Sequence, residues 1–159
     1  MKKVLVVMGS DSDLKVMEKC VDRLKSFGIP TEVRICSAHR TPAVAEQLAK
    51  NAAGEGFGVI IAAAGKAAHL GGVLAAYTTL PVIGVPMATS VMGGMDSLLS
   101  IVQMPKGIPV ATVAIDGADN AAILAAQMIA LSDEFRRFRC FAEQKELVEY
   151  SSLWVQGDS

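Results

Sequence analysis

The fold of this chain is decided by a short stretch near its start, VLVVMGSDSD (residues 4–13). Its first five residues are all apolar, and a run without polar alternation predicts a strand that is buried on both faces. Gly9 then permits a tight turn, and the serine and aspartate residues after it are typical of a helix start. Apolar residues recur at helical spacing from Leu14 to Leu24, and we expect Gly28 to end this helix. The stretch therefore predicts a strand followed by a helix.

The same order of strand and helix recurs along most of the chain. Further strands are predicted at residues 31–35, 59–63, 81–85 and 110–114. Further helices are predicted at about residues 41–53, 67–77, 95–104 and 120–131, the first opened by Thr41 as N-cap and Pro42 at the next position. Because strands that alternate with helices pair in parallel and are covered on both faces, we expect an α/β fold. The expected architecture is a flavodoxin-like three-layer αβα sandwich with a five-stranded parallel sheet and an extra C-terminal helix at residues 133–154.

Length and composition predict one globular domain, residues 1–159. With 52% hydrophobic and 19% charged residues, the chain is too apolar to be disordered. It is also apolar for a small monomer, so we expect part of its surface to be buried between subunits. The net charge of -1, without a basic block, predicts no nucleic-acid partner.

Three features bear on the compartment. No apolar run approaches the roughly 20 residues that a membrane span needs, so we expect no membrane partner. The apolar run at the start breaks at Gly9 without a cleavage site after it, which does not favour a signal peptide. The cysteines, Cys20, Cys36 and Cys140, are odd in number and scattered, which argues against a disulfide framework and favours a cytoplasmic location.

The polar chemistry of the chain is concentrated where predicted strands end. Loops at residues 9–13, 36–41 and 64–72 follow the first three strands, and residues 87–94 follow the fourth. Ligands of open α/β sheets bind outside the carboxyl ends of the strands. Because His39 and His69, the chain's two histidines, both fall in these loops, we expect one site at this edge of the sheet.

The first of these loops has the features of an anion site. Ser10 and Ser12 offer hydroxyls, and the helix start offers free backbone N–H groups. Two carboxylates beside a bare phosphate would repel it, so we expect Asp13 to face sugar hydroxyls instead. Plain helix capping accounts for the same residues, and the pattern alone leaves both interpretations open.

The second loop combines a hydroxyl, an imidazole and a guanidinium, at Ser37, His39 and Arg40. Arg40 suits bidentate phosphate binding, and His39 can carry a proton near neutral pH. A lone loop histidine is often structural, but this close grouping favours a site.

The third loop, AGKAAHLGG (residues 64–72), is built of small residues that let a flat ring or a carboxylate approach backbone amides. Close packing of a helix on the sheet would select the same residues.

Several other sites are not indicated. Residues 60–67 lack the first glycine and the final hydroxyl of a P-loop, and no dinucleotide-binding glycine pattern follows the first strand. We expect no metal, because the two histidines are thirty positions apart and no cysteine or carboxylate stands at ligand spacing from either. Cys36 has no visible base to activate it, so a buried thiol is favoured over a nucleophile.

Four motifs in this order carry a resemblance to a known family. They are GSDSD (9–13), SAHRTP (37–42), AAHL (67–70) and DSLLSIVQMP (96–105). Together they resemble the N5-carboxyaminoimidazole ribonucleotide mutase family of de novo purine biosynthesis, over residues 4 to about 131. The resemblance implies a homo-octamer of flavodoxin-like subunits without a metal or organic cofactor, acting on a small ribonucleotide.

The resemblance also implies roles for individual residues. Ser10 and Arg40 would lie near the phosphate and Asp13 near the ribose, while His39 would transfer the proton. The remaining implied substrate-binding residues line the same site or enclose the base and the migrating carboxylate: Ser12, Ser37, Ala38, Gly65, Lys66, Ala67, His69 and Leu70.

The chain departs from the family pattern at two positions. The usual pattern of the family is Gly-Gly-Ala-Ala-His-Leu-Pro-Gly. This chain has Lys66 in place of the second glycine and Gly71 in place of the proline. A sister class, aminoimidazole ribonucleotide carboxylase, uses free carbon dioxide and carries a basic residue near the position of Lys66. It usually lacks the histidine that His69 matches and has lysine where Arg40 stands. We therefore interpret the chain as a mutase and keep the carboxylase as the alternative.

A non-enzymatic flavodoxin-like nucleotide-binding module is a second alternative. A phosphorylatable receiver needs an aspartate at the end of the third strand, where Ala62-Ala63-Ala64 stands. A flavin carrier needs aromatic residues at strand ends, and Tyr77, Tyr150 and Trp154 lie elsewhere. Both features favour the enzyme.

Overall fold

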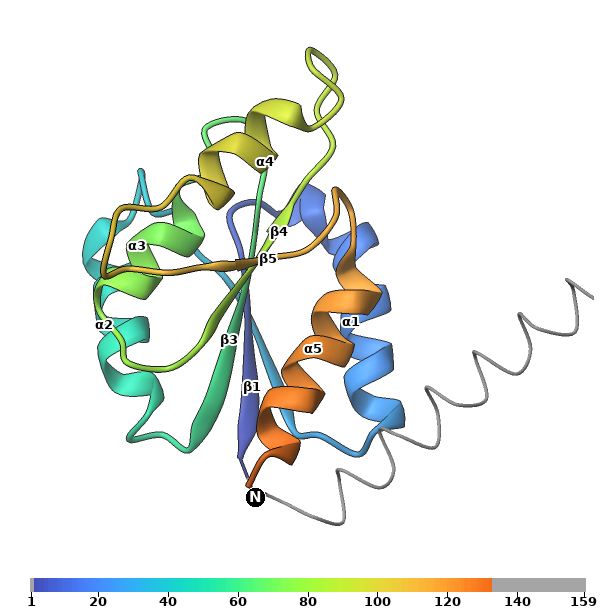
Figure 1. Cartoon of the computed structure of the whole chain (residues 1–159), viewed down its shortest axis with the longest axis vertical. Coiled ribbons are helices and arrows are strands. Elements are labelled where there is room, and N and C mark those ends of the chain that lie inside the picture. The colour runs from blue at the N-terminus through green and yellow to red at the C-terminus, as the bar shows by residue number, and fades with distance from the viewer. Residues whose placement is uncertain (1, 133–159) are drawn as a thin grey trace, which may run out of the picture.

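Five parallel strands form the centre of the structure, a computed structural model that describes residues 2–132. The strands are β1 (Lys3–Met8), β2 (Thr31–Ile35), β3 (Phe57–Ala64), β4 (Val82–Pro86) and β5 (Ala111–Thr112). Their order in the sheet is β2-β1-β3-β4-β5, which is the flavodoxin-like order (Figure 1). The expected five-stranded parallel sheet is confirmed.

Helices cover both faces of this sheet. They are α1 (Leu14–Ser26), α2 (Pro42–Ala52), α3 (Leu70–Ala76), α4 (Met95–Val102) and α5 (Ala118–Ala130), with a short 3-10 turn, η1 (Asp11–Asp13), before α1. In Figure 1, α1 and α5 lie together on one side of the sheet, and α2 and α3 lie on the other. The three-layer sandwich is therefore confirmed, while the predicted C-terminal helix at 133–154 lies outside the described residues.

Two apolar cores account for the lack of polar alternation in the strands. The side chains of Val59, Ile61 and Ala63 in β3 pack with α1 and α5, and the intervening Ile60 and Ala62 pack with α2, α3 and Ile101 of α4. Successive side chains of a strand point to opposite faces, so a strand between two helical layers must be apolar throughout.

Several element boundaries differ from those expected. β3 begins at Phe57, two residues earlier, because Phe57 is buried and pairs with Lys3 across a register shift. β5 has only two residues, and α3 begins at Leu70 rather than near Ala67. The residues before α3 form tight turns instead, in which the amides of Ala68 and His69 donate to the carbonyls of Lys66 and Ala67.

Thr41 fulfils only part of its predicted role. It occupies the N-cap of α2, but its side chain makes no capping bond. Its hydroxyl donates to the carbonyl of Ser37 at 2.8 Å and so braces the loop before the helix. Gly28 follows α1 with a φ of 65°, the left-handed conformation in which glycine ends helices.

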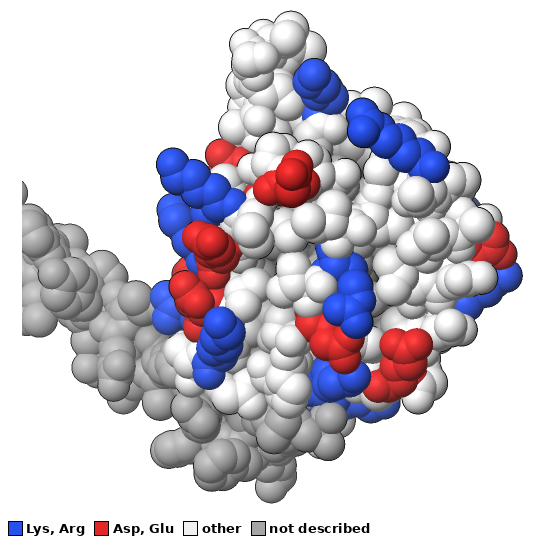
Figure 2. All heavy atoms as spheres, turned by 180° about the vertical axis from the view of Figure 1, so that it is seen from behind, with Lys and Arg blue, Asp and Glu red and all other residues white. Residues whose placement is uncertain are grey.

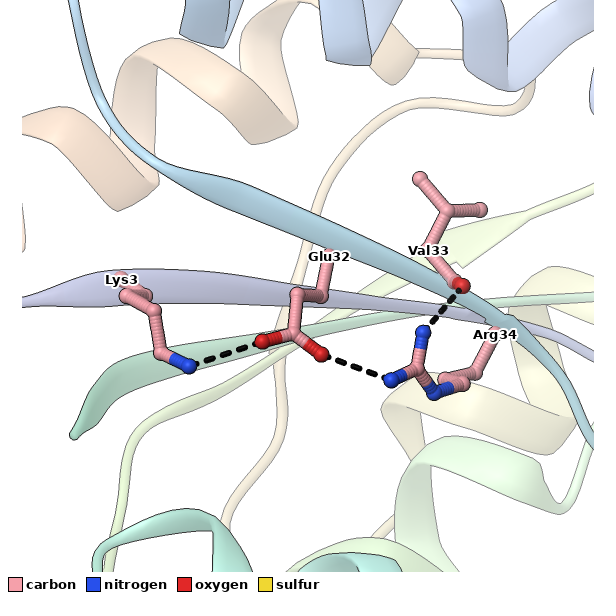
Figure 3. A network of polar contacts seen from close by, with 4 residues as sticks. All are labelled: Lys3, Glu32, Val33 and Arg34. Atoms are coloured by element: carbon pink, nitrogen blue, oxygen red, sulfur yellow. Dashed lines mark hydrogen bonds and ion pairs between the residues drawn. The ribbon is translucent and has the colours of Figure 1, made fainter. Parts of the chain in front are cut away.

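Charged side chains protect the exposed edge of the sheet at β2. Glu32 accepts from Lys3 Nζ at 2.8 Å and from Arg34 Nη2 at 2.7 Å (Figure 3). Charges on an edge strand discourage pairing with another sheet.

On the face seen in Figure 2, acidic and basic side chains are interspersed. Within residues 2–132, no helix combines the length and apolar character that crossing a bilayer requires.

Gly84 sets how closely α4 approaches the sheet. It lies in β4, and a methyl group built there would overlap Cγ2 of Ile101 in α4. α4 therefore packs directly against the backbone of β4 at Gly84.

We predict that Gly84→Ala destabilises the fold by about 1–3 kcal/mol, because the added methyl group overpacks a rigid contact between strand and helix. Gly54→Ala is the matched control, since a methyl group there meets only the Asn51 carbonyl at 3.5 Å and no positive φ is required. Denaturant unfolding of both variants checks this. Equal stability of the two variants would contradict the close contact.

Candidate functional site

The register of the sheet brings the loops after four strands to one place. Met8 at the end of β1 pairs with Ile35 of β2 and Ala63 of β3, and Ala64 pairs with Pro86 of β4. Backbone hydrogen bonds continue past the strand ends, from the Gly9 amide to Ala63, from Cys36 to Met8 and from Met87 to Ala64, at 2.8–3.0 Å. The loops after β1, β2, β3 and β4 therefore leave the sheet side by side.

A pocket of about 530 Å³ opens between these loops. Every sequence-predicted site residue except His69 lines it: Ser10, Ser12, Asp13, Ser37, Ala38, His39, Arg40, Gly65, Lys66, Ala67 and Leu70. The structure thus brings together residues from three separate predicted loops. His69 lies outside the lining and reaches the pocket through His39.

The first loop shows that capping and pocket lining coexist. Ser10 is the N-cap of η1, and its side-chain oxygen accepts from the amide of Ser12 at 3.3 Å and from the Ser12 hydroxyl at 2.9 Å. Asp13, at the end of this turn, is 9% exposed. The two interpretations of this loop were therefore not exclusive.

Asp13 is the buried carboxyl of the pocket. Its burial raises the pKa of the carboxyl, with smaller rises from the neighbouring Asp11 and Asp116 carboxylates. Hydrogen bonds with the Ser10 backbone and the Ser12 side chain oppose the rise. A partly desolvated carboxylate of this kind is a good acceptor for hydroxyl groups of a ligand.

The second loop is a braced turn that carries the charged chemistry. The amide of Arg40 donates to Ser37 Oγ at 3.2 Å, and the amide of Thr41 donates to the Ser37 carbonyl at 2.8 Å. Ala38 is buried and anchors the turn, whereas His39 and Arg40 are exposed toward solvent. Across residues 2–132, no carboxylate lies within ion-pair distance of Arg40 or Lys66. The pocket therefore contains two cations that are available to an anionic ligand.

The two histidines meet, although thirty positions separate them. Nε2 of His39 lies 2.9 Å from Nδ1 of His69, and the rings are edge to face with centroids 5.0 Å apart. The contact agrees with the expectation that both histidines lie at one edge of the sheet. Within the described part of the chain, no group of three or more histidine, cysteine, aspartate or glutamate side chains has a geometry that suits a metal ion.

The third loop contains the one pocket residue with strained backbone. Lys66 has a φ of 55°, a left-handed conformation that glycine adopts without cost and other residues disfavour. The Ser100 hydroxyl of α4 donates to the Asp96 carbonyl at 2.6 Å and also lies 3.3 Å from the Lys66 carbonyl, so this loop is close to α4. Gly71 lies against the sheet, because a methyl group there would be 3.7 Å from Cβ of Ala62 in β3. This contact supports the close-packing interpretation of the loop.

The sequence analysis placed the loop at residues 87–94 at this edge of the sheet but named no site residue in it. The pocket is lined there by Met87, Ala88, Thr89 and Ser90. Thr89 Oγ1 donates to Asp96 at 2.8 Å, and the amide of Ala88 donates to Asp116 at 2.9 Å, so carboxylates behind the pocket hold this loop. Its position after a strand was the available signal, but it carries no charged side chain. Gly9 and Ala64 were also missed.

The described cysteines stand apart from this chemistry. Cys36 is buried at the end of β2, and its sulfur lies 3.6 Å from Thr41 Oγ1. Burial raises the pKa of the Cys20 thiol to about 12. A thiol with such a pKa is not a nucleophile at neutral pH.

We predict that Asp13→Asn raises the stability of the fold at neutral pH. Burial raises the carboxyl pKa in the folded state, so the folded chain gains stability as protons bind. This gain is complete below the unfolded-state pKa and is lost as the pH rises through the folded-state pKa. Thermal unfolding from neutral to acidic pH checks this, and the advantage of the neutral Asn should shrink toward acid. An advantage that grows toward acid would contradict the stated cause.

Comparisons with known proteins show which family the chain resembles. The family model described as AIR carboxylase matches residues 3–149. The N5-carboxyaminoimidazole ribonucleotide mutase of Pyrococcus horikoshii is 58% identical over 126 residues, which cover 79% of this chain and 71% of that protein. The mutase of Saccharolobus solfataricus is 54% identical over 143 residues, which cover 87% of this chain and 90% of that protein. The crystal structure of Treponema denticola PurE superposes with a TM-score of 0.84 at 29% identity over 94% of both chains. The chain therefore belongs to the AIR carboxylase family.

Proposed function

We propose that this chain is an N5-carboxyaminoimidazole ribonucleotide mutase of de novo purine biosynthesis. It converts N5-carboxyaminoimidazole ribonucleotide into 4-carboxy-5-aminoimidazole ribonucleotide. One observation carries the proposal, namely that the imidazole of His39 and the guanidinium of Arg40 line the same pocket as the buried Asp13. Relatives at 54–58% identity that carry the mutase name support it.

The ribonucleotide is held by the first two loops. Arg40, which has no carboxylate partner among residues 2–132, binds the phosphate together with Ser10. Asp13 accepts hydrogen bonds from the ribose hydroxyls, since its carboxylate is poorly solvated. The neighbouring lining residues that complete this binding surface are Ser12, Ser37 and Ala38.

The reaction moves a carboxyl group within one substrate. The bond between nitrogen and the carboxyl carbon breaks, carbon dioxide leaves, and the nitrogen takes up a proton from His39. The ring carbon then attacks the carbon dioxide that the pocket retains, an advantage of proximity. His39 removes the ring proton and restores aromaticity. Atoms and electrons balance without an oxidant, a reductant or an organic cofactor.

The third loop holds the migrating carboxylate. Gly65 and Ala67 are small residues that line the pocket, so a carboxylate can approach their backbone, and Lys66 adds a positive charge beside them. Leu70, at the start of α3, encloses the base. Donors fixed in advance around a developing negative charge stabilise it without reorganisation.

The enzyme acts in the cytoplasm as a homo-octamer. A run of exposed apolar side chains supports self-association: Val91 is 83% exposed, and Met92, Met95, Leu99 and Val102 are each about half exposed. They follow the pocket loop after β4 and continue along α4. A patch of this kind beside a site favours burial between subunits.

The carboxylase that uses free carbon dioxide is the second candidate, because Lys66 lines the pocket. We predict that wild type converts the N5-carboxy substrate without added bicarbonate, and that Lys66→Gly retains this activity. The variant should fold, since glycine fits a φ of 55° better than lysine does. Assays with each carboxyl donor check this. Faster turnover of aminoimidazole ribonucleotide with carbon dioxide than of the N5-carboxy substrate would favour the carboxylase.

We expect His39 to act in catalysis and the adjacent Arg40 to act in substrate binding. We predict that His39→Asn abolishes turnover and spares nucleotide affinity, because Asn keeps polarity but cannot transfer the proton. Arg40→Ala should weaken binding by about 1.5–3 kcal/mol through loss of charged hydrogen bonds. Calorimetric titration and single-turnover rates measure the two effects. Near-normal rates for His39→Asn, or unchanged affinity for Arg40→Ala, would remove the assigned role.

A further inference from the structure

We infer that Asp116, in the turn after β5, is a positioning residue that fixes the pocket loop after β4. This loop, residues 87–90, forms one wall of the pocket, and Asp116 itself is outside the pocket lining. The inference rests on the proposed function for its effect on turnover, and on the contacts between the two segments for its structural part.

Asp116 contacts the loop after β4 through both its backbone and its side chain. Its amide donates to the carbonyl of Pro86 at 2.8 Å, at the last residue of β4. Its Oδ1 accepts from the amide of Ala88 at 2.9 Å, two residues farther along the chain. Asp116 therefore spans the point at which the chain leaves the sheet and enters the pocket wall.

The backbone conformation of Asp116 is one that most side chains disfavour. Its φ is 56°, in the left-handed region that glycine adopts without cost. Aspartate and asparagine enter this region more readily than other side chains do. Glycine would relieve the strain at this position, but it would lose the bond to Ala88. A strained residue that keeps a contact with a pocket loop is typical of a functional role.

The turn around Asp116 is itself held in place. The amide of Gly117 donates to the Ala114 carbonyl at 2.8 Å, and a methyl group at Gly117 would lie only 2.7 Å from that carbonyl oxygen. A methyl group at Gly94, which precedes α4, would lie 2.7 Å from Cγ2 of Ile115. The turn is therefore tight, and it contacts the chain between β4 and α4 at both of its ends.

Two donors of the loop after β4 are bound by carboxylates outside the pocket lining. The Ala88 amide donates to Asp116, and the Thr89 hydroxyl donates to Asp96 at 2.8 Å. A donor that already has a carboxylate partner does not compete for an anionic ligand. These two groups therefore shape the wall and leave the charged groups of the substrate to the cations of the other loops.

The charge of Asp116 also reaches the pocket. Burial is the main cause of the raised pKa of the Asp13 carboxyl, and the carboxylates of Asp11 and Asp116 add to the rise. A variant that keeps the acceptor oxygen of Asp116 and removes its charge therefore separates a geometric role from an electrostatic one.

Two substitutions test the inference. Asp116→Asn keeps Oδ1 as an acceptor and tolerates a φ of 56°, whereas Asp116→Gly removes the acceptor and relieves the backbone. Because Asp116 is exposed, both variants should unfold within a few degrees of wild type. A large drop in the unfolding temperature of Asp116→Gly would overturn the inference, since Asp116 would then hold the whole fold.

The first readout is hydrogen exchange of the full chain, measured by mass spectrometry, and it is independent of turnover. We expect peptides that cover residues 87–90 to exchange roughly 3- to 10-fold faster in Asp116→Gly, because the Ala88 amide loses its acceptor. Asp116→Asn should exchange there at the wild-type rate. Peptides that cover residues 37–41 are the internal control and should not change. Equal exchange at residues 87–90 in wild type and Asp116→Gly would overturn the inference.

The second readout is kinetic. We expect Asp116→Gly to raise KM for the N5-carboxy substrate by roughly 3- to 10-fold with kcat within about threefold of wild type, because a displaced wall loses contacts made equally with substrate and transition state. Asp116→Asn should retain the wild-type KM. An unchanged KM in Asp116→Gly, or an equal rise in Asp116→Asn, would overturn the positioning role. A wild-type enzyme without turnover would overturn the proposed function instead, and hydrogen exchange would still decide the contact.

Discussion

The pocket depends on backbone hydrogen bonds that carry the sheet one residue beyond its strand ends. The amides of Gly9, Cys36 and Met87 donate to carbonyls of the neighbouring strand at 2.8–3.0 Å. These bonds fix where each loop leaves the sheet, so the side chains that follow are placed by the register of the strands. A slip of one residue would turn the side chains of a strand to the opposite face. The sheet therefore sets where each pocket loop begins.

The charged residues of the pocket contribute little to the stability of the fold. Arg40 and Lys66 have no carboxylate partner within residues 2–132, and burial raises the pKa of Asp13. Lys66 in addition adopts a left-handed backbone. The burial of the Asp13 carboxyl and the left-handed backbone of Lys66 each cost folding free energy, and such costs concentrate at functional sites.

The elements that could be predicted from sequence are those with strong local signals. β2 matched its predicted residues, and the buried run of β1 was recognised because an apolar run without alternation is typical of a strand covered on both faces. Glycine and proline marked the ends of α1 and the start of α2. Loops that follow strands were correctly assigned to one edge, since parallel strands share that edge.

What the sequence did not reveal depends on contacts between distant residues. Nothing at His39 or His69 indicates that their rings meet, because the contact arises from the spatial order of β1, β2 and β3. The late start of α3 reflects turns around Lys66, and the lining at residues 87–90 has no charged side chain to reveal it. Thr41 has the right residue type for a cap, but its hydroxyl bonds to Ser37 instead.

A crystal structure with aminoimidazole ribonucleotide bound tests the central claim most directly, namely that the loops after β1, β2 and β3 form one nucleotide site. We predict the phosphate within hydrogen-bond distance of Arg40 and Ser10, the ribose hydroxyls at Asp13, and the base between His39 and the loop at Gly65. A nucleotide bound away from these loops, or with its phosphate remote from Arg40, would contradict the account.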